Sequence, residues 1–111
     1  MNFKDLVKSF PDSYSAIVIK QIRSVFIFAK GAHKGQKRAS GEPYITHCIA
    51  VASILVELKV PAIVISAALL HDTVEDTTIT LDDIKEKFGD DIASLVNGVT
   101  KLSNIPHVSR A

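Results

Sequence analysis

Residues 68–77 read ALLHDTVEDT, an apolar helical run that ends in a group of ionisable side chains. That group holds one histidine and three acids: His71, Asp72, Glu75 and Asp76. On a helix, where each residue advances about 100°, the four fall on one side. Three acids and an imidazole so close together repel one another and lose hydration unless a positive charge lies among them. The stretch therefore favours a divalent cation, with His71 and Asp72 as ligands if the helix opens or turns there and the two later acids facing a metal-bound water.

The composition limits the class of protein. A chain of 111 residues, 47% hydrophobic, supports one globular domain. Its net charge of +1 gives no reason to expect a nucleic acid or a membrane surface as partner. The lone Cys48 excludes an internal disulfide framework, and no apolar leader opens the chain, so a cytoplasmic location is expected.

Helical spacing predicts the fold. The apolar period indicates helices near residues 3–10, 13–30, 43–58, 61–76, 80–88 and 90–102. Pro43 and Pro61 are expected in first turns, Thr80 and Asp83 resemble a capping box, and Asp90 or Asp91 is expected to cap the last helix. Residues 103–111 are typical of a loop or a chain end. With no sheet indicated, we expect an all-α bundle of five or six helices.

Two further features strengthen the metal hypothesis. Residues 31–41, GAHKGQKRASG, form a basic, glycine-punctuated loop that could approach a polyphosphate. His47 follows it, in phase with Val51, Ile54 and Leu58, so it is expected to point partly inward and beside His71. Each feature has a simpler alternative: a solvated helix end for the acids, a surface loop, or a hydrogen-bonded core histidine. His33 is a candidate for supporting the ligands from behind.

Three segments carry a family resemblance. They are AHKGQKRASGEPYITH at 32–47, AALLHDTVEDTTIT at 67–80 and FGDDIASLVNGVTKL at 88–102. Together they resemble the HD hydrolase domain of the RelA/SpoT family, the bifunctional alarmone enzymes. The resemblance implies an HD-superfamily helical fold. It also implies removal of pyrophosphate from the 3′ position of guanosine tetra- or pentaphosphate, a reaction of the stringent response.

The resemblance also implies roles for individual residues. Manganese, or another divalent metal, would be bound by His47, His71 and Asp72 together with a later aspartate. Glu75 and Asp76 match the acidic pair that orients and activates the attacking water. This agrees with the chemistry inferred from the residues alone, in which a carboxylate takes the proton from water.

The basic loop matches the family's nucleotide-binding stretch. Arg38 matches the arginine that packs on guanine, and Lys37 and Ser40 lie beside it as further substrate-binding candidates. Two positions depart from the family pattern: Cys48 stands where proline is usual, and Ala39 where many members have lysine.

The end of the chain departs more. The family's fourth ligand lies in a later Asp-Arg-Leu-His-like segment that this sequence lacks, so residues 1–111 are expected to be the amino-terminal part of an HD domain. We expect weak hydrolysis and self-association through exposed apolar faces of the helices at 45–58 and 91–102. A hydrolase for another nucleotide and a non-catalytic folded fragment remain the alternatives.

Overall fold

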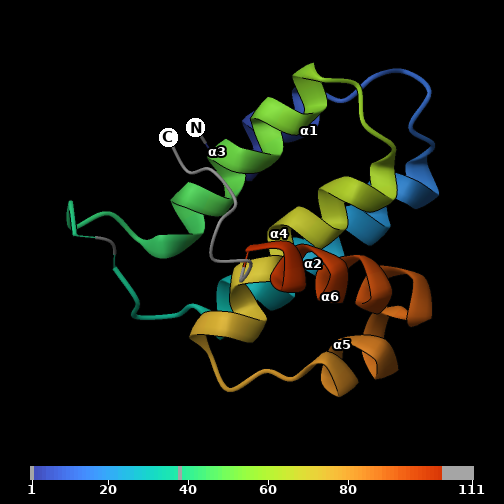
Figure 1. Cartoon of the computed structure of the whole chain (residues 1–111). Helices are drawn as coiled ribbons and strands as arrows, with labels where there is room; N and C mark the ends of the chain where they lie inside the picture. Colours follow the sequence, from blue (N-terminus) through green and yellow to red (C-terminus); the bar gives the residue numbers. More distant parts are fainter. Residues whose placement is uncertain (1, 38, 104–111) are drawn as a thin grey trace.

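Helices account for the regular structure of the described chain. The computed structural model describes residues 2–37 and 39–103, and over these it has six helices and one isolated β-bridge, between Lys37 and Pro43. The helices are α1 Phe3–Lys8, α2 Ala16–Ala32, α3 Tyr44–Glu57, α4 Ala62–Asp76, α5 Leu81–Phe88 and α6 Asp90–Ser103 (Figure 1). The predicted all-α bundle is confirmed.

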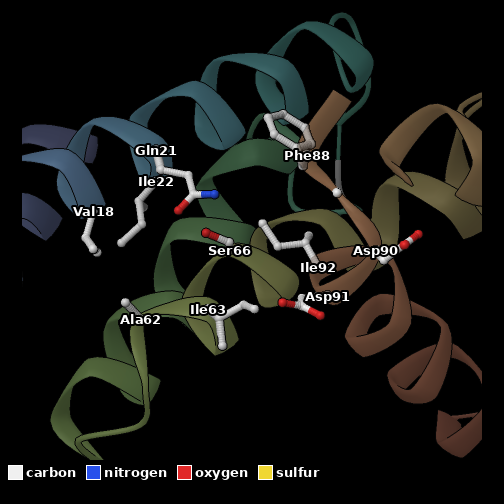
Figure 2. Close-up of a pocket in the computed structure, with 11 residues that line it drawn as sticks. Val18, Gln21, Ile22, Ala62, Ile63, Ser66, Phe88, Asp90, Asp91 and Ile92 are labelled. Atoms are coloured by element: carbon white, nitrogen blue, oxygen red, sulfur yellow. The ribbon is translucent and has the colours of Figure 1, made fainter. Parts of the chain in front are cut away.

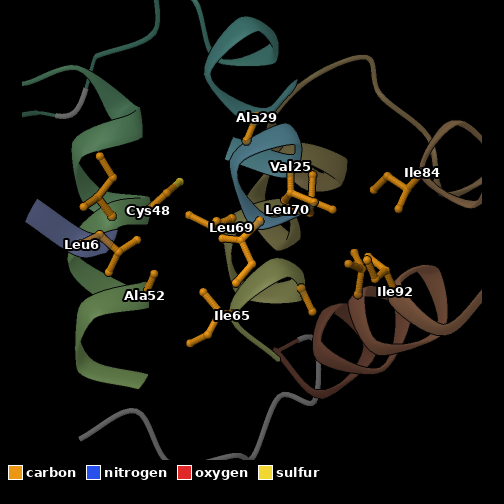
Figure 3. Close-up of a cluster of buried hydrophobic side chains, with 14 of the residues drawn as sticks. Leu6, Val25, Ala29, Cys48, Ala52, Ile65, Leu69, Leu70, Ile84 and Ile92 are labelled. Atoms are coloured by element: carbon orange, nitrogen blue, oxygen red, sulfur yellow. The ribbon is translucent and has the colours of Figure 1, made fainter. Parts of the chain in front are cut away.

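Helix α4 forms the centre of the bundle and packs against α2, α3 and α6. Its Leu69 and Leu70 belong to one core cluster with side chains of the other helices, among them Leu6 of α1, Val25 of α2 and Ile92 of α6 (Figure 3). A helix covered on several sides can be apolar around most of its circumference. This explains why the sequence before His71 is an almost continuous apolar run.

Local hydrogen bonds set several helix ends as predicted. The Ser15 side chain accepts from the Val18 N–H and starts α2. Thr80 and Asp83 form the expected reciprocal capping box of α5, at 3.1 and 2.9 Å. Gly89 ends α5 with a φ of 101°, a backbone conformation that favours glycine.

Other ends differ from the prediction by a residue or two. Pro43 and Pro61 are the N-caps of α3 and α4 and lie just before the first turns. Both have an extended backbone, a conformation that the proline ring allows. Proline has no N–H to donate, and none is required of it at this position. Asp90 and Asp91 lie within the first turn of α6, where a negative charge favours the helix dipole. Helix α2 extends beyond Lys30 to Ala32.

His47 is half-buried, as expected, but α3 does not bury all the residues that share its phase. Ile54 and Leu58, which share its phase, are 58% and 67% exposed. The buried face consists of Cys48, Ile49, Ala52 and Val56. Both faces of α3 are apolar, so the periodicity of the sequence alone could not determine which one packs against α1 and α4.

The predicted loop or chain end at residues 103–111 lies almost wholly outside the described residues. Ser103 closes α6, and residues 104–111, including His107, lie outside the described residues. Across the described helices, none is both long and apolar enough to cross a lipid bilayer.

Candidate active site

The candidate site begins with a pair of side chains near the end of α4. His71 Nε2 lies 2.9 Å from Asp72 Oδ1. His71 Nδ1 donates to the carbonyl of Ala68 at 3.0 Å, because a carbonyl can only accept. The hydrogen bond with Asp72 is the main influence that raises the pKa of His71 to about 8; burial opposes it, and Ala68 and Glu75 reinforce it. At neutral pH the pair is therefore an ion pair.

Asp72 carries its charge in a buried position, with a residue exposure of 8%. Burial alone would raise the pKa of its carboxyl group. The hydrogen bond and charge of His71, the nearby Tyr44 hydroxyl and the charge of His47 together outweigh burial, and the pKa of Asp72 lies below its usual value. A buried carboxylate supported in this way is available to an incoming cation.

Tyr44, the first residue of α3, connects the components of the site. Its ring stacks on the His33 ring, with the centroids 4.8 Å apart, and contacts the His47 ring edge-on, with the centroids 5.8 Å apart. Its hydroxyl donates to Asp76 Oδ2 at 3.1 Å. Burial and then the negative charge of Asp72 raise the pKa of Tyr44, so the hydroxyl remains protonated and acts as a donor.

A chain of hydrogen bonds joins the loop before α3 to the last turns of α4. Gln36 Nε2 donates to the carbonyl of Asp76 at 2.7 Å, so Gln36 Oε1 is the acceptor for His33 Nδ1 at 2.8 Å. His33 Nε2 then accepts from the Thr73 hydroxyl at 3.3 Å. His33 is 3% exposed and Thr73 is fully buried. His33 is thus hydrogen-bonded to Thr73, the neighbour of Asp72.

The structure brings only some of the predicted metal ligands together. His71 and Asp72 are in contact, whereas His47 is half-buried on α3 beside Tyr44. Among the described residues, no three histidine, cysteine, aspartate or glutamate side chains form a group that could hold a metal ion. The charge of His47 nevertheless contributes to the lowered pKa of Asp72.

The predicted catalytic acids lie on the last turn of α4. Glu75 and Asp76 are both exposed. The charge of Glu75 contributes to the raised pKa of His71, and Asp76 is bonded to Tyr44. The acids are thus accessible to solvent beside a buried ion pair.

The predicted substrate-binding residues belong to the loop between α2 and α3. Lys37 and Ser40 are exposed, and Ser40 Oγ accepts from the Glu42 N–H at 3.5 Å. Arg38 lies outside the described residues. Gly35 and Gly41 have φ of 84° and 90°, a backbone conformation that favours glycine, and so allow the chain to turn at these two positions.

Cys48, which takes the place of the usual proline, is part of the core. It is 2% exposed. Burial, followed by the charge of Asp72, raises its pKa to about 12, so it is a neutral thiol. The helix begins before this position, at Tyr44, and continues through it.

A separate cavity lies away from these residues. Its volume is about 580 Å³, and it lies between α2, α4 and the junction of α5 and α6 (Figure 2). Val18, Ile63, Ser66 and Asp91 are among its lining residues. None of the candidate ligands, acids or loop residues lines this cavity.

The sequence of the chain is similar to that of a known protein family. The sequence model of the HD domain family matches residues 26–111. The chain belongs to the HD domain family. The matched region contains α3 and α4 and all the candidate site residues of this HD domain.

Several relatives of this HD domain are RelA/SpoT-type proteins, as the resemblance predicted. It is 51% identical over 87 residues to the bifunctional (p)ppGpp synthase/hydrolase SpoT of Escherichia coli strain K12, covering 78% of this chain and 12% of that protein. It is 46% identical over 87 residues to guanosine-3′,5′-bis(diphosphate) 3′-pyrophosphohydrolase of Vibrio cholerae, with the same coverage. A probable GTP pyrophosphokinase of Mycobacterium leprae is 46% identical over 100 residues, which are 90% of this chain and 13% of that protein. The chain thus spans about an eighth of these relatives' length.

Proposed function

We propose that this HD domain hydrolyses the 3′-pyrophosphate of guanosine tetra- or pentaphosphate and depends on a divalent metal, manganese first. The contact of His71 with Asp72, beside the exposed acids Glu75 and Asp76, is the observation that carries the proposal. The names of the relatives in Escherichia coli and Vibrio cholerae support the choice of substrate.

The donor atoms of the pair suit a metal ion. Because Ala68 engages His71 Nδ1, the other ring nitrogen is the one directed at Asp72. A cation would replace the proton on that nitrogen and be held by His71 Nε2, Asp72 and, as third ligand, His47. This mixture of nitrogen and oxygen donors is acceptable to manganese, iron or zinc. When bound, the ion would supply charge that makes the attacking water more acidic and screens the phosphate.

The acids and the loop supply the remaining functions. Glu75 and Asp76 would orient the water and take its proton, since both carboxylates are exposed on the side of α4 that carries His71. Lys37, Arg38 and Ser40 would bind the nucleotide, with the arginine on the base and the lysine on phosphate.

The wider setting follows from the same residues. A single, buried free thiol favours a reducing, cytoplasmic compartment, and a net charge of +1 gives no reason to expect nucleic acid or a membrane surface as partner. The exposed Ile54 and Leu58 favour association of the chain with a second copy.

The decisive experiment is a nucleotide assay on the purified chain. Manganese-dependent release of pyrophosphate from guanosine tetraphosphate should exceed release from guanosine 5′-diphosphate, which has no 3′-pyrophosphate. The release should stop when EDTA is added, and the Asp72→Asn variant should show none. Faster turnover of another nucleotide would favour a different HD phosphohydrolase. A folded chain that neither binds manganese nor turns over any nucleotide would contradict the proposal.

A further inference from the structure

The last residue of α4 is held at two points, by Gln36 of the loop before α3 and by Tyr44, the first residue of α3. The carbonyl of Asp76 accepts from Gln36 Nε2 at 2.7 Å, and its carboxylate accepts from the Tyr44 hydroxyl at 3.1 Å. Asp76 itself is exposed. An exposed aspartate at a helix end would ordinarily sample several side-chain rotamers, so these two contacts restrict both its backbone and its side chain.

The two residues that hold Asp76 are themselves fixed. Gln36 receives a hydrogen bond from buried His33, and its own carbonyl accepts from the Tyr44 N–H at 3.0 Å. The Tyr44 ring stacks on His33. His33 is in turn bonded to Thr73, one turn before Asp76. The result is a closed circuit that begins and ends on α4.

A hydroxyl and an amide are well suited to this position. A carboxylate at the C-terminal end of a helix faces the negative end of the helix dipole and is destabilised there. A neutral donor offsets that effect without neutralising the carboxylate, whereas a lysine or arginine would form an ion pair with it. Tyr44 therefore restrains Asp76 without forming an ion pair with it.

We propose that Tyr44 and Gln36 are positioning residues that hold Asp76 in one orientation and tie the loop before α3 to the last turn of α4. The catalytic part of this inference rests on the proposed hydrolase function, while the structural part does not. Neither residue need touch the substrate. Their effect is to keep Asp76, one of the two proposed water-activating acids, at a fixed position relative to the loop that carries Lys37 and Ser40.

The test compares two tyrosine-to-phenylalanine variants. Tyr44→Phe keeps the ring stacked on His33 and removes only the hydroxyl. Tyr14→Phe is the matched control, because the Tyr14 hydroxyl donates to the Val60 carbonyl at 3.0 Å, away from the site. In the manganese-dependent assay Tyr44→Phe should lower kcat by about 10-fold, the scale of one hydrogen bond to a charged group, and leave KM within about twofold. Tyr14→Phe should leave both constants unchanged.

A second measurement is independent of activity. In the parent chain the Hα–Hβ couplings of Asp76 should be unequal, as expected for a single χ1 rotamer, and in Tyr44→Phe they should average. Gln36→Met should speed amide exchange at Thr77 without affecting Leu70. Averaged couplings in the parent, or a restrained Asp76 in Tyr44→Phe, would overturn the positioning role. An inactive parent with these NMR changes present would count against the hydrolase function and leave the positioning role standing.

Discussion

Asp72 contacts His71 although the two residues are consecutive in a regular helix. Neighbouring helical side chains normally diverge by about 100° and do not face each other. Here His71 Nε2 and Asp72 Oδ1 lie 2.9 Å apart, and the hydrogen bond from His71 Nδ1 to the Ala68 carbonyl orients the imidazole ring. The ionisation of this pair should be measurable.

The stability of the metal-free chain should fall as the pH rises through about 8. The pKa of His71 is raised in the folded chain, so its contribution is complete below about 6.5 and is lost as the imidazolium deprotonates. The loss should be at most about 2 kcal/mol in the free energy of unfolding between pH 6 and pH 9. Urea denaturation in EDTA measures it. His71→Gln should remove most of the change; an equal change in that variant would assign it elsewhere.

Manganese binding should depend on the residues of both helices. Replacing His71 by Ala, Asp72 by Asn or His47 by Ala should each weaken binding by about 10-fold or more. Asp90→Asn, an exposed acid on α6, is the control and should bind as the parent does. Calorimetric titration, with circular dichroism to check folding, distinguishes these cases. Unchanged affinity in all three site variants would place the metal outside this region.

The acids Glu75 and Asp76 should matter for turnover and little for folding. Glu75→Gln and Asp76→Asn should each reduce pyrophosphate release by about 10²-fold, the usual scale for losing an acid–base group. Both side chains are exposed, so melting temperatures should stay close to that of the parent. Near-normal turnover in both amides would remove these residues from the catalytic step.

The exposed face of α3 should govern association of the chain. Ile54 and Leu58 are 58% and 67% exposed and lie one turn apart. Changing both to Glu should weaken self-association by about 10-fold or more, since burying one unpaired charge costs well over about 1.4 kcal/mol. Ile17→Glu, at an 81% exposed position of α2, is the matched control. Sedimentation of the parent as a monomer at all concentrations would rule out association through this face.

The fold could be predicted because its determinants are local. The capping box of Thr80 and Asp83 and the glycine that ends α5 involve residues close together in the sequence. The inward face of α3 could not be predicted, because that helix has two apolar faces and only contact with α1 and α4 selects between them. Local patterns therefore determined where helices occur, and tertiary packing determined how α3 is oriented.

For the candidate site, too, features within one helix could be predicted from the sequence and contacts between distant segments could not. The proximity of His71 and Asp72, and of both to Glu75 and Asp76, could be inferred from one helical segment. Tyr44 and Gln36 were missed, because their contacts with Asp76 depend on how the loop before α3 folds back toward α4. A tyrosine and a glutamine beside a basic loop are too common to indicate such a role from spacing alone.

The hydrogen bonds that join the loop to α4 have a consequence for how the chain folds. Those from Gln36 to Asp76 and from Thr73 to His33 each close a span of 40 residues. Individual helices can form before such long spans close, because closure carries an entropic cost that local contacts avoid. A folding intermediate could therefore have most of its helical content and still lack the site. Recovery of manganese binding during refolding should lag behind recovery of helical circular dichroism, and simultaneous recovery would contradict this order of events.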